Sequence, residues 1–183
     1  MILPAHRPDH PGHSRRRASG FTLIELVVTL AVFGVLLALA MPALRDLVIN
    51  TRLSTASSEM QTALGLARNE AITRHQSVSV CPSANGTTCS GDWNNEQGVI
   101  VLTDSDSQVL KYIQINTASI KIITGGNNFG GSNSISFGAA GRLASTTSDG
   151  TLKFCDTSTS NYGRQLQVFW IGRVESSKNA ICP

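Results

Sequence analysis

The stretch that decides the fold is GFTLIEL at residues 20–26, which opens into an almost wholly apolar run, LVVTLAVFGVLLALAMPAL at residues 26–44. An α-helix of that length spans roughly 28 Å, close to the ~30 Å hydrocarbon thickness of a bilayer. The run therefore predicts a single membrane-spanning helix near the N-terminus. A buried helix of a soluble protein is the alternative.

The charge around this run predicts its orientation. Residues 1–20 carry four Arg against one Asp, whereas the sequence after the run is close to neutral. An excess of Arg before a membrane helix places the N-terminus in the cytoplasm and the remainder outside it. A cleaved secretory signal peptide is the alternative. Against it, no A-x-A-type site follows the run, and residues 41–43 (Met-Pro-Ala) continue into a helical pattern.

Glu25 is an ionisable residue at the mouth of the apolar run. Placing a carboxylate inside a membrane costs about 2.5–3.5 kcal/mol even on lenient scales, so such a residue indicates a function. A signal peptide has no use for it. The alternative is a glutamate that simply sits at the level of the lipid headgroups.

The motif Gly20-Phe21-Thr22-Leu23-Ile24-Glu25-Leu26 resembles the cleavage site of type IV prepilins and type II secretion pseudopilins. The resemblance implies that a prepilin peptidase cuts after Gly20 and methylates the new N-terminal Phe21, while the helix is retained. It further implies three parts: a leader at 1–20, a transmembrane and polymerisation helix at 21–44, and a periplasmic globular domain at 45–183. The chain would reside in the bacterial inner membrane and then in a pilus or pseudopilus.

The resemblance also gives Glu25 and Pro42 roles. Cleavage leaves a cationic amine on Phe21, and in a filament the Glu25 carboxylate of a neighbouring subunit would neutralise it. Because an unpaired buried charge is disfavoured and a paired one is tolerated, the pair would select the axial register of the subunits. Pro42, the twenty-second residue of the mature chain, removes one helical hydrogen bond and should kink the helix.

Beyond the membrane run, apolar residues recur every three or four positions up to Ala71, which is typical of an amphipathic helix. One helix is therefore expected over residues 22–75. Short β-prone runs separated by Gly, Asn, Ser and Asp follow it. A long helix followed by antiparallel strands is an α+β arrangement, and it matches the pilin fold that the N-terminal motif implies. The expected strands are Val78–Cys81, Val99–Thr103, Val109–Ile115, Ile120–Thr124, Ser134–Phe137, Leu152–Cys155 and Leu166–Ile171.

All four cysteines lie beyond the predicted membrane span, and an even number there indicates disulfides in an oxidising periplasm. Of the three possible pairings, we favour Cys81–Cys89, which closes a turn-rich loop, together with Cys155–Cys182, which ties the last strands. Each would stabilise the domain by about 2–4 kcal/mol. Zinc is the rival explanation, but the sequence has no C-x-x-C and only one histidine after the leader, so no metal or other cofactor is expected.

Further motifs resemble the minor pilins and pseudopilins of the GspH/FimT type: CPS at 81–83 with Cys89 and Trp93, GVIV at 98–101, and SFGAAGR at 136–142. The resemblance implies a structural subunit of a type II secretion pseudopilus or a type IV pilus. The implied partners are other pilins or pseudopilins, the prepilin peptidase and an inner-membrane assembly platform.

No catalytic constellation is visible in the sequence, and we expect the chain not to be an enzyme. His75, the only candidate base after the leader, falls at the predicted helix end beside Arg74. Asp104 and Asp106 lack the further acids of an EF-hand. Neither a Walker nor a dinucleotide-binding glycine motif is present.

A DNA-binding minor pilin for DNA uptake is the alternative function. Residues 107–183 carry seven basic and three acidic groups, a net +4, whereas residues 21–106 carry a net −4. Some FimT-like pilins bind DNA through a Gly-Arg-x-Arg motif, and this chain has Gly172-Arg173-Val174-Glu175, in which an acid replaces the second cation. That acid would repel phosphate. The candidate DNA contacts are Arg142, Arg164, Arg173 and Lys178, with Lys153 as a further cation.

Overall fold

The computed structural model describes residues 20–93, 98–115, 119–126, 133–144, 149–158, 163–178 and 180–182. All of the predicted leader except Gly20 lies outside these residues. The chain divides into two compact units, Met1–Pro42 and Ala43–Pro183. Helix α1 supplies the described helical part of the first unit and the opening element of the second.

Helix α1 spans Leu23–Arg74, 52 residues, which agrees with the predicted 22–75 to within one residue at each end. It ends where His75 adopts a left-handed conformation with φ 53°, the usual geometry just past a helix C-terminus. Arg74 forms an ion pair of 2.6 Å with Glu70 in the last turn. A cation at that position also interacts favourably with the helix dipole.

The part of α1 in the first unit carries large apolar side chains that are all exposed, from Leu23 to Met41. Its most apolar 18-residue window has a mean hydropathy of 2.7, so α1 is long and apolar enough to cross a membrane. The helix continues through position 42. The kink expected at Pro42 stays a prediction.

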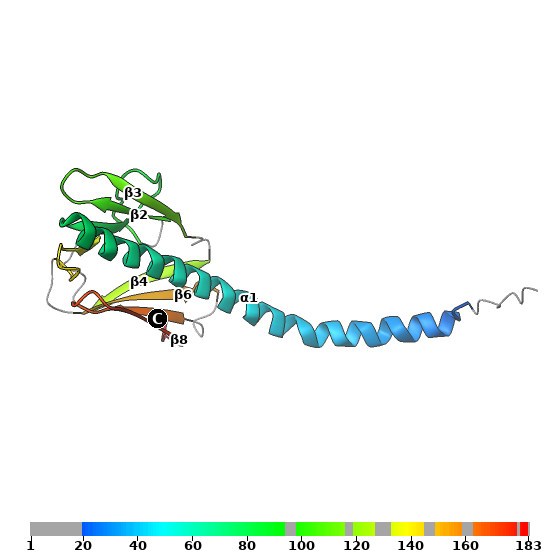
Figure 1. Ribbon diagram of the computed structural model, residues 1–183. Helices are drawn as coiled ribbons and strands as arrows, with labels where there is room; N and C mark the ends of the chain where they lie inside the picture. The colour runs from blue at the N-terminus through cyan, green and yellow to red at the C-terminus, as the bar shows by residue number, and fades with distance from the viewer. Residues whose placement is uncertain are drawn as a thin grey trace, which may run out of the picture. The chain divides into compact units, whose positions relative to one another are not determined.

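Within the described residues the strands form two antiparallel four-stranded sheets, where the sequence had indicated only a single sheet domain. The first has the order β3-β2-β1-β5 and the second the order β4-β6-β7-β8. In the view of Figure 1, β2 and β3 are drawn above α1 and β4 and β6 below it, and residues of both sheets share one core with the helix. The strands are β1 (Val78–Pro82), β2 (Gly98–Thr103), β3 (Val109–Gln114), β4 (Ile120–Gly126), β5 (Ile135–Phe137), β6 (Gly150–Asp156), β7 (Gly163–Val168) and β8 (Val174–Lys178).

The core lies between the second half of α1 and the inner faces of both sheets. The cross-strand partners Val80 and Val101 in one sheet, and Leu152 and Leu166 in the other, are all fully buried in this core. The predicted apolar stripe is buried from Leu53 onward, but its first members, Leu44, Leu47 and Val48, are exposed. Burial of the helix begins instead at Ile49, which the stripe did not include. The buried members of the stripe are Leu53, Ala56, Met60, Ala63, Leu64, Ala67 and Ala71, and they share one core with Val78, Val99, Phe137, Ile122 and Phe154 among the strand residues.

The prediction was wrong about the end of the chain. A strand was expected at Leu166–Ile171, but β7 begins at Gly163 and ends at Val168, because residues 169–172 form the turn into β8. In that turn Gly172 has φ 86°, a conformation that a glycine adopts without steric cost. Strand β8 was not predicted. It is one of the two outer strands described in its sheet and pairs with β7 from Val168↔Val174 to Arg164↔Lys178.

Candidate processing and assembly site

The Gly20–Phe21 bond lies immediately before helix α1. Gly20 and Phe21 precede the first helical residue, Leu23, and the Phe21 side chain is 85% exposed. A Cβ placed on Gly20 would have no atom within 4 Å. The bond is therefore in irregular, accessible chain, which is the form of substrate that a peptidase can enclose.

Thr22 and Glu25 form the start of the helix together. The Glu25 backbone N–H donates to Thr22 Oγ1 at 3.3 Å, and the Leu26 N–H donates to the Thr22 carbonyl at 3.2 Å. A threonine followed three residues later by a glutamate is the capping-box pattern. Glu25 is thereby held in the first turn, where a carboxylate opposes the positive end of the helix dipole.

The sequence interpretation overlooked Thr22, although the Thr-x-x-Glu spacing is visible at residues 22–25. Because Thr22 follows the Gly20–Phe21 bond, the helix cap lies on the C-terminal side of that bond. Cleavage there would leave the cap and the first turn of α1 within the same product.

Both favoured disulfides are present. Cys81 bonds Cys89, and Cys155 bonds Cys182. The first closes the segment from Cys81 to Cys89, in which Gly86 packs against the ring of Tyr112. The second ties the C-terminal segment to β6, and the Ala180 N–H donates to the Gly163 carbonyl at 3.1 Å.

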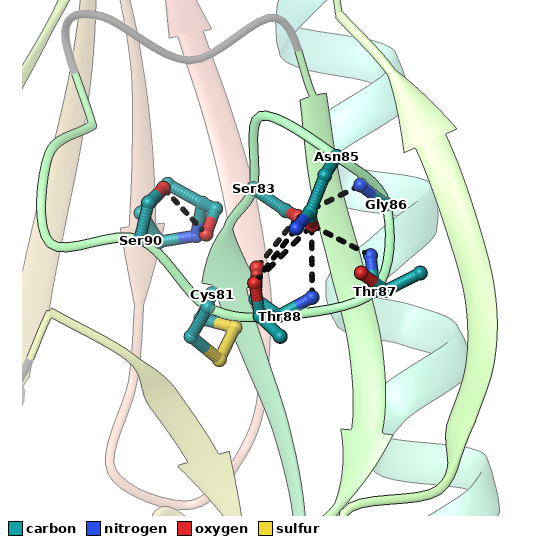
Figure 2. The surroundings of a disulfide bond; sticks show 9 residues. Cys81, Ser83, Asn85, Gly86, Thr87, Thr88 and Ser90 are labelled. Carbon is teal, nitrogen blue, oxygen red and sulfur yellow. Dashed lines mark hydrogen bonds between the residues drawn. A yellow bond between two sulfur atoms is a disulfide. The ribbon is translucent and has the colours of Figure 1, made fainter.

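The Cys81–Cys89 loop also has its own hydrogen bonds, which Figure 2 shows converging on two side chains. Asn85 Oδ1 accepts from the Thr87 and Thr88 N–H groups at 2.9 and 3.0 Å. Ser83 Oγ donates to the Thr88 carbonyl at 2.7 Å and accepts from the Gly86 N–H at 3.0 Å. These hydrogen bonds thus give the loop a defined conformation.

The two aspartates considered as calcium ligands accept hydrogen bonds instead, Asp106 within the β2–β3 turn and Asp104 from β5. Asp104 accepts a hydrogen bond of 2.7 Å from the Ser136 hydroxyl. Asp106 accepts from the Thr103 hydroxyl, and this bond, followed by the Gln108 N–H, lowers the pKa of Asp106. Within the described residues, no three His, Cys, Asp or Glu side chains gather to hold a metal ion.

The four candidate DNA contacts do not lie together. Arg142 and Arg173 are near the β7–β8 turn, where Arg142 lies over the Trp170 ring at 5.3 Å. Arg164 and Lys178 are cross-strand partners at the opposite end of the same hairpin. That end is four residues away on each strand, roughly 13 Å at ~3.3 Å per residue.

Arg173 makes two side-chain contacts within the chain. It forms an ion pair of 2.9 Å with Glu175, and it lies over the Phe169 ring at 4.3 Å. The acid that replaces the second cation of the Gly-Arg-x-Arg pattern thus neutralises the first one. DNA contact by these residues remains a hypothesis.

Comparison with known proteins gives two family matches. Residues 56–172 match the model of the type II transport protein GspH, and residues 15–41 match the prokaryotic N-terminal methylation motif. The methylation-motif match encloses the Gly20–Phe21 bond, Thr22 and Glu25.

Individual relatives agree. The fimbrial protein EcpC of Eikenella corrodens is 33% identical over 118 residues, which cover 56% of this chain and 72% of the relative. A fimbrial protein of Pseudomonas aeruginosa is 43% identical over 53 residues, covering 29% of this chain and 34% of that protein. The crystal structure of the type IV minor pilin FimU of Pseudomonas aeruginosa superposes with a TM-score of 0.57 at 18% identity. The superposition covers 73% of this chain and 96% of the FimU chain, and it shows that the two chains share a fold.

Proposed function

The chain belongs to the GspH family and is a minor pilin or pseudopilin of a type IV pilus or type II secretion system, and from that premise we propose how it is processed and assembled. A prepilin peptidase cleaves after Gly20 and methylates Phe21. The chain crosses the inner membrane once with its N-terminus in the cytoplasm, and an assembly platform then moves it into the filament. Its work is structural, without catalysis.

The observation that carries this proposal is the position of Glu25 in the first turn of α1, behind the Thr22 cap. After cleavage the amine of Phe21 would be one residue before that cap. A cation there is repelled by the positive end of the helix dipole. A carboxylate therefore has to offset both the amine and the dipole when apolar helices surround them and exclude water.

The Glu25 of one subunit would pair with the Phe21 amine of its neighbour. The helix that carries them presents exposed apolar side chains from Leu23 to Met41, which is the surface that lipid covers before assembly and other helices cover after it. Removing one partner of a desolvated ion pair costs about 3–5 kcal/mol, because the other charge is left uncompensated. The pair consequently favours the single axial register in which both charges are neutralised.

The experiment compares the wild-type chain with Glu25→Gln and Glu70→Gln in cells that lack the native copy. Mass spectrometry of the protein from sheared filaments should find an N-methylated Phe21 start. Glu25→Gln should be cleaved and remain in the membrane fraction, whereas Glu70→Gln, a matched carboxylate loss on the same helix, should assemble. Assembly of Glu25→Gln at the wild-type level, or a filament form that retains residues 1–20, would refute the proposal.

A further inference from the structure

Exposed apolar side chains gather at one place in the sheet-bearing unit. Past Val48, the described residues include five exposed large hydrophobic side chains, and three of them belong to one surface: Ile72 (43% exposed), Trp170 (39%) and Ile171 (44%). The other two, Tyr112 on β3 and Ile181 near the C-terminus, stand apart from it in the sequence and in their contacts. We call Ile72, Trp170 and Ile171, with Arg68 and Arg142, the distal patch, because it lies at the C-terminal end of α1.

The members of the distal patch are linked through two turns, at residues 138–142 and 169–173. A Cβ on Gly141 would lie 2.7 Å from Ile72 Cδ1, so the 138–142 turn rests on the helix. Arg68 Nη2 donates to the Ile171 carbonyl at 3.3 Å. The Leu143 N–H donates to the Trp170 carbonyl at 2.9 Å, which joins the two turns. The patch is thus held rigid before any partner arrives, and preorganisation lowers the cost of binding.

The composition of the patch is that of a protein-binding surface. Trp and Arg are the residues most enriched among those that dominate interface energetics. Arg142 covers the Trp170 ring and forms no ion pair within the described part of the chain. The nearby carboxylate of Asp149 accepts a hydrogen bond of 2.9 Å from the Trp170 backbone N–H. Arg68 reaches a carbonyl oxygen instead of an acid. The complementary surface would therefore be apolar and would present a carboxylate to Arg142.

A nucleic acid fits this surface less well. A phosphate backbone is bound by several unpaired cations in a row. Here Arg173 is neutralised by Glu175, and Arg164 and Lys178 lie at the other end of the hairpin. Exposed Ile72 and Ile171 contribute nothing to phosphate binding. A second copy meeting the patch face to face is also disfavoured, because it would bring like charges together.

We propose that the distal patch is the surface on which a different pilin subunit of the same filament docks, through an apolar area with an acidic residue opposite Arg142. This rests on the proposed function, since it supposes that the chain is in a filament. It adds a contact between globular domains to the contact between N-terminal helices. The helix pair sets the axial register, and the distal patch selects which subunit is the neighbour.

The test uses the full chain in cells whose native copy is deleted. Arg142→Glu and Ile171→Ser change the patch, and Lys111→Glu and Ile181→Ser make the same changes at exposed positions away from it. The amount of chain in sheared filaments should fall about tenfold for each patch variant, the effect of an interface residue that matters, and should be unchanged in each control. A photo-crosslinking amino acid at position 171, but not at 181, should form an adduct that mass spectrometry identifies as another pilin.

Wild-type incorporation of both patch variants, with no pilin adduct at position 171, would refute this inference alone. An adduct with a second copy of this chain would also overturn it. So would binding of the full chain in detergent micelles to duplex DNA that Arg142→Glu abolishes, in the absence of a pilin adduct. Absence of the wild-type chain from filaments would refute the proposed function, and this inference with it.

Discussion

Gly172 approaches Gly141 so closely that a Cβ on Gly172 would lie 1.9 Å from the Gly141 carbonyl oxygen. Both glycines have positive φ, 86° and 70°. The contact joins the 138–142 turn to the 169–173 turn, and Arg68 lies against both. Two segments about thirty residues apart in the sequence thereby form one support for the end of α1.

Replacing Gly172 with Ala should destabilise the domain by about 2–4 kcal/mol, because the new methyl group collides with backbone and the φ angle disfavours it. Thermal unfolding of the full chain in detergent, followed by circular dichroism, measures the change. Gly65→Ala is the matched control. Position 65 is helical with open space around its Cβ, so the same substitution should stabilise by about 1 kcal/mol there. Equal effects at both sites would contradict the collision.

The two disulfides should differ in their contributions to stability. Their sequence separations are 8 for Cys81–Cys89 and 27 for Cys155–Cys182. In the loop-entropy model these correspond to about 2.5 and about 3.5 kcal/mol. Replacing both cysteines of one pair with Ser, and measuring unfolding by denaturant, should show the larger loss for Cys155–Cys182. A larger loss for the shorter loop would show that its hydrogen bonds, and not chain entropy, dominate.

Asp106 should make the domain less stable in acid. The Thr103 hydroxyl, followed by the Gln108 N–H, lowers the pKa of Asp106 below its ordinary 3.8, so the folded state favours the ionised form. This contribution is complete above pH 3.8 and disappears as the pH falls through the lowered pKa. As the pH falls below 3.8, the free energy of unfolding should decrease less in Asp106→Asn than in the wild-type chain. An equal decrease in the variant would show that the hairpin bond does not contribute.

Glu59 should make the domain less stable as the pH rises, which is opposite to the effect of Asp106. Desolvation by burial raises the pKa of Glu59 above its ordinary 4.5, so the folded state binds its proton more tightly than the unfolded state does. Stability from this group is therefore lost as the pH rises from 4.5 through the raised pKa. Glu59→Gln should increase the melting temperature at pH 7 and leave it unchanged below pH 4. A decrease at pH 7 would show that the carboxylate is stabilising.

The helix was predictable because the patterns that indicate it are local in the sequence. The disulfides were predictable because few pairings are possible. The apolar run, the three-and-four spacing and the change of pattern after His75 fix the helix within one residue at each end. Four cysteines allow three pairings, and the turn residues between Cys81 and Cys89 favour the short loop. The Thr22 cap was equally local, and only its role was missed.

The end of the chain was not predictable in the same way. Strand β8 (VESSK) has one apolar residue and no alternation, since an outer strand is ordered by pairing with β7 and not by burial. The contact of Arg68 with Ile171 joins residues 103 positions apart, and no sequence pattern marks it. Glu175 was read as a residue that repels phosphate, whereas its structural role is the ion pair with Arg173.

Strand β8 closes its sheet with exposed polar residues and with Glu175 and Lys178, which an approaching strand would have to desolvate. Charged outer strands resist edge-to-edge pairing between chains. An edge of this kind therefore disfavours the pairing of β8 with a strand of another chain.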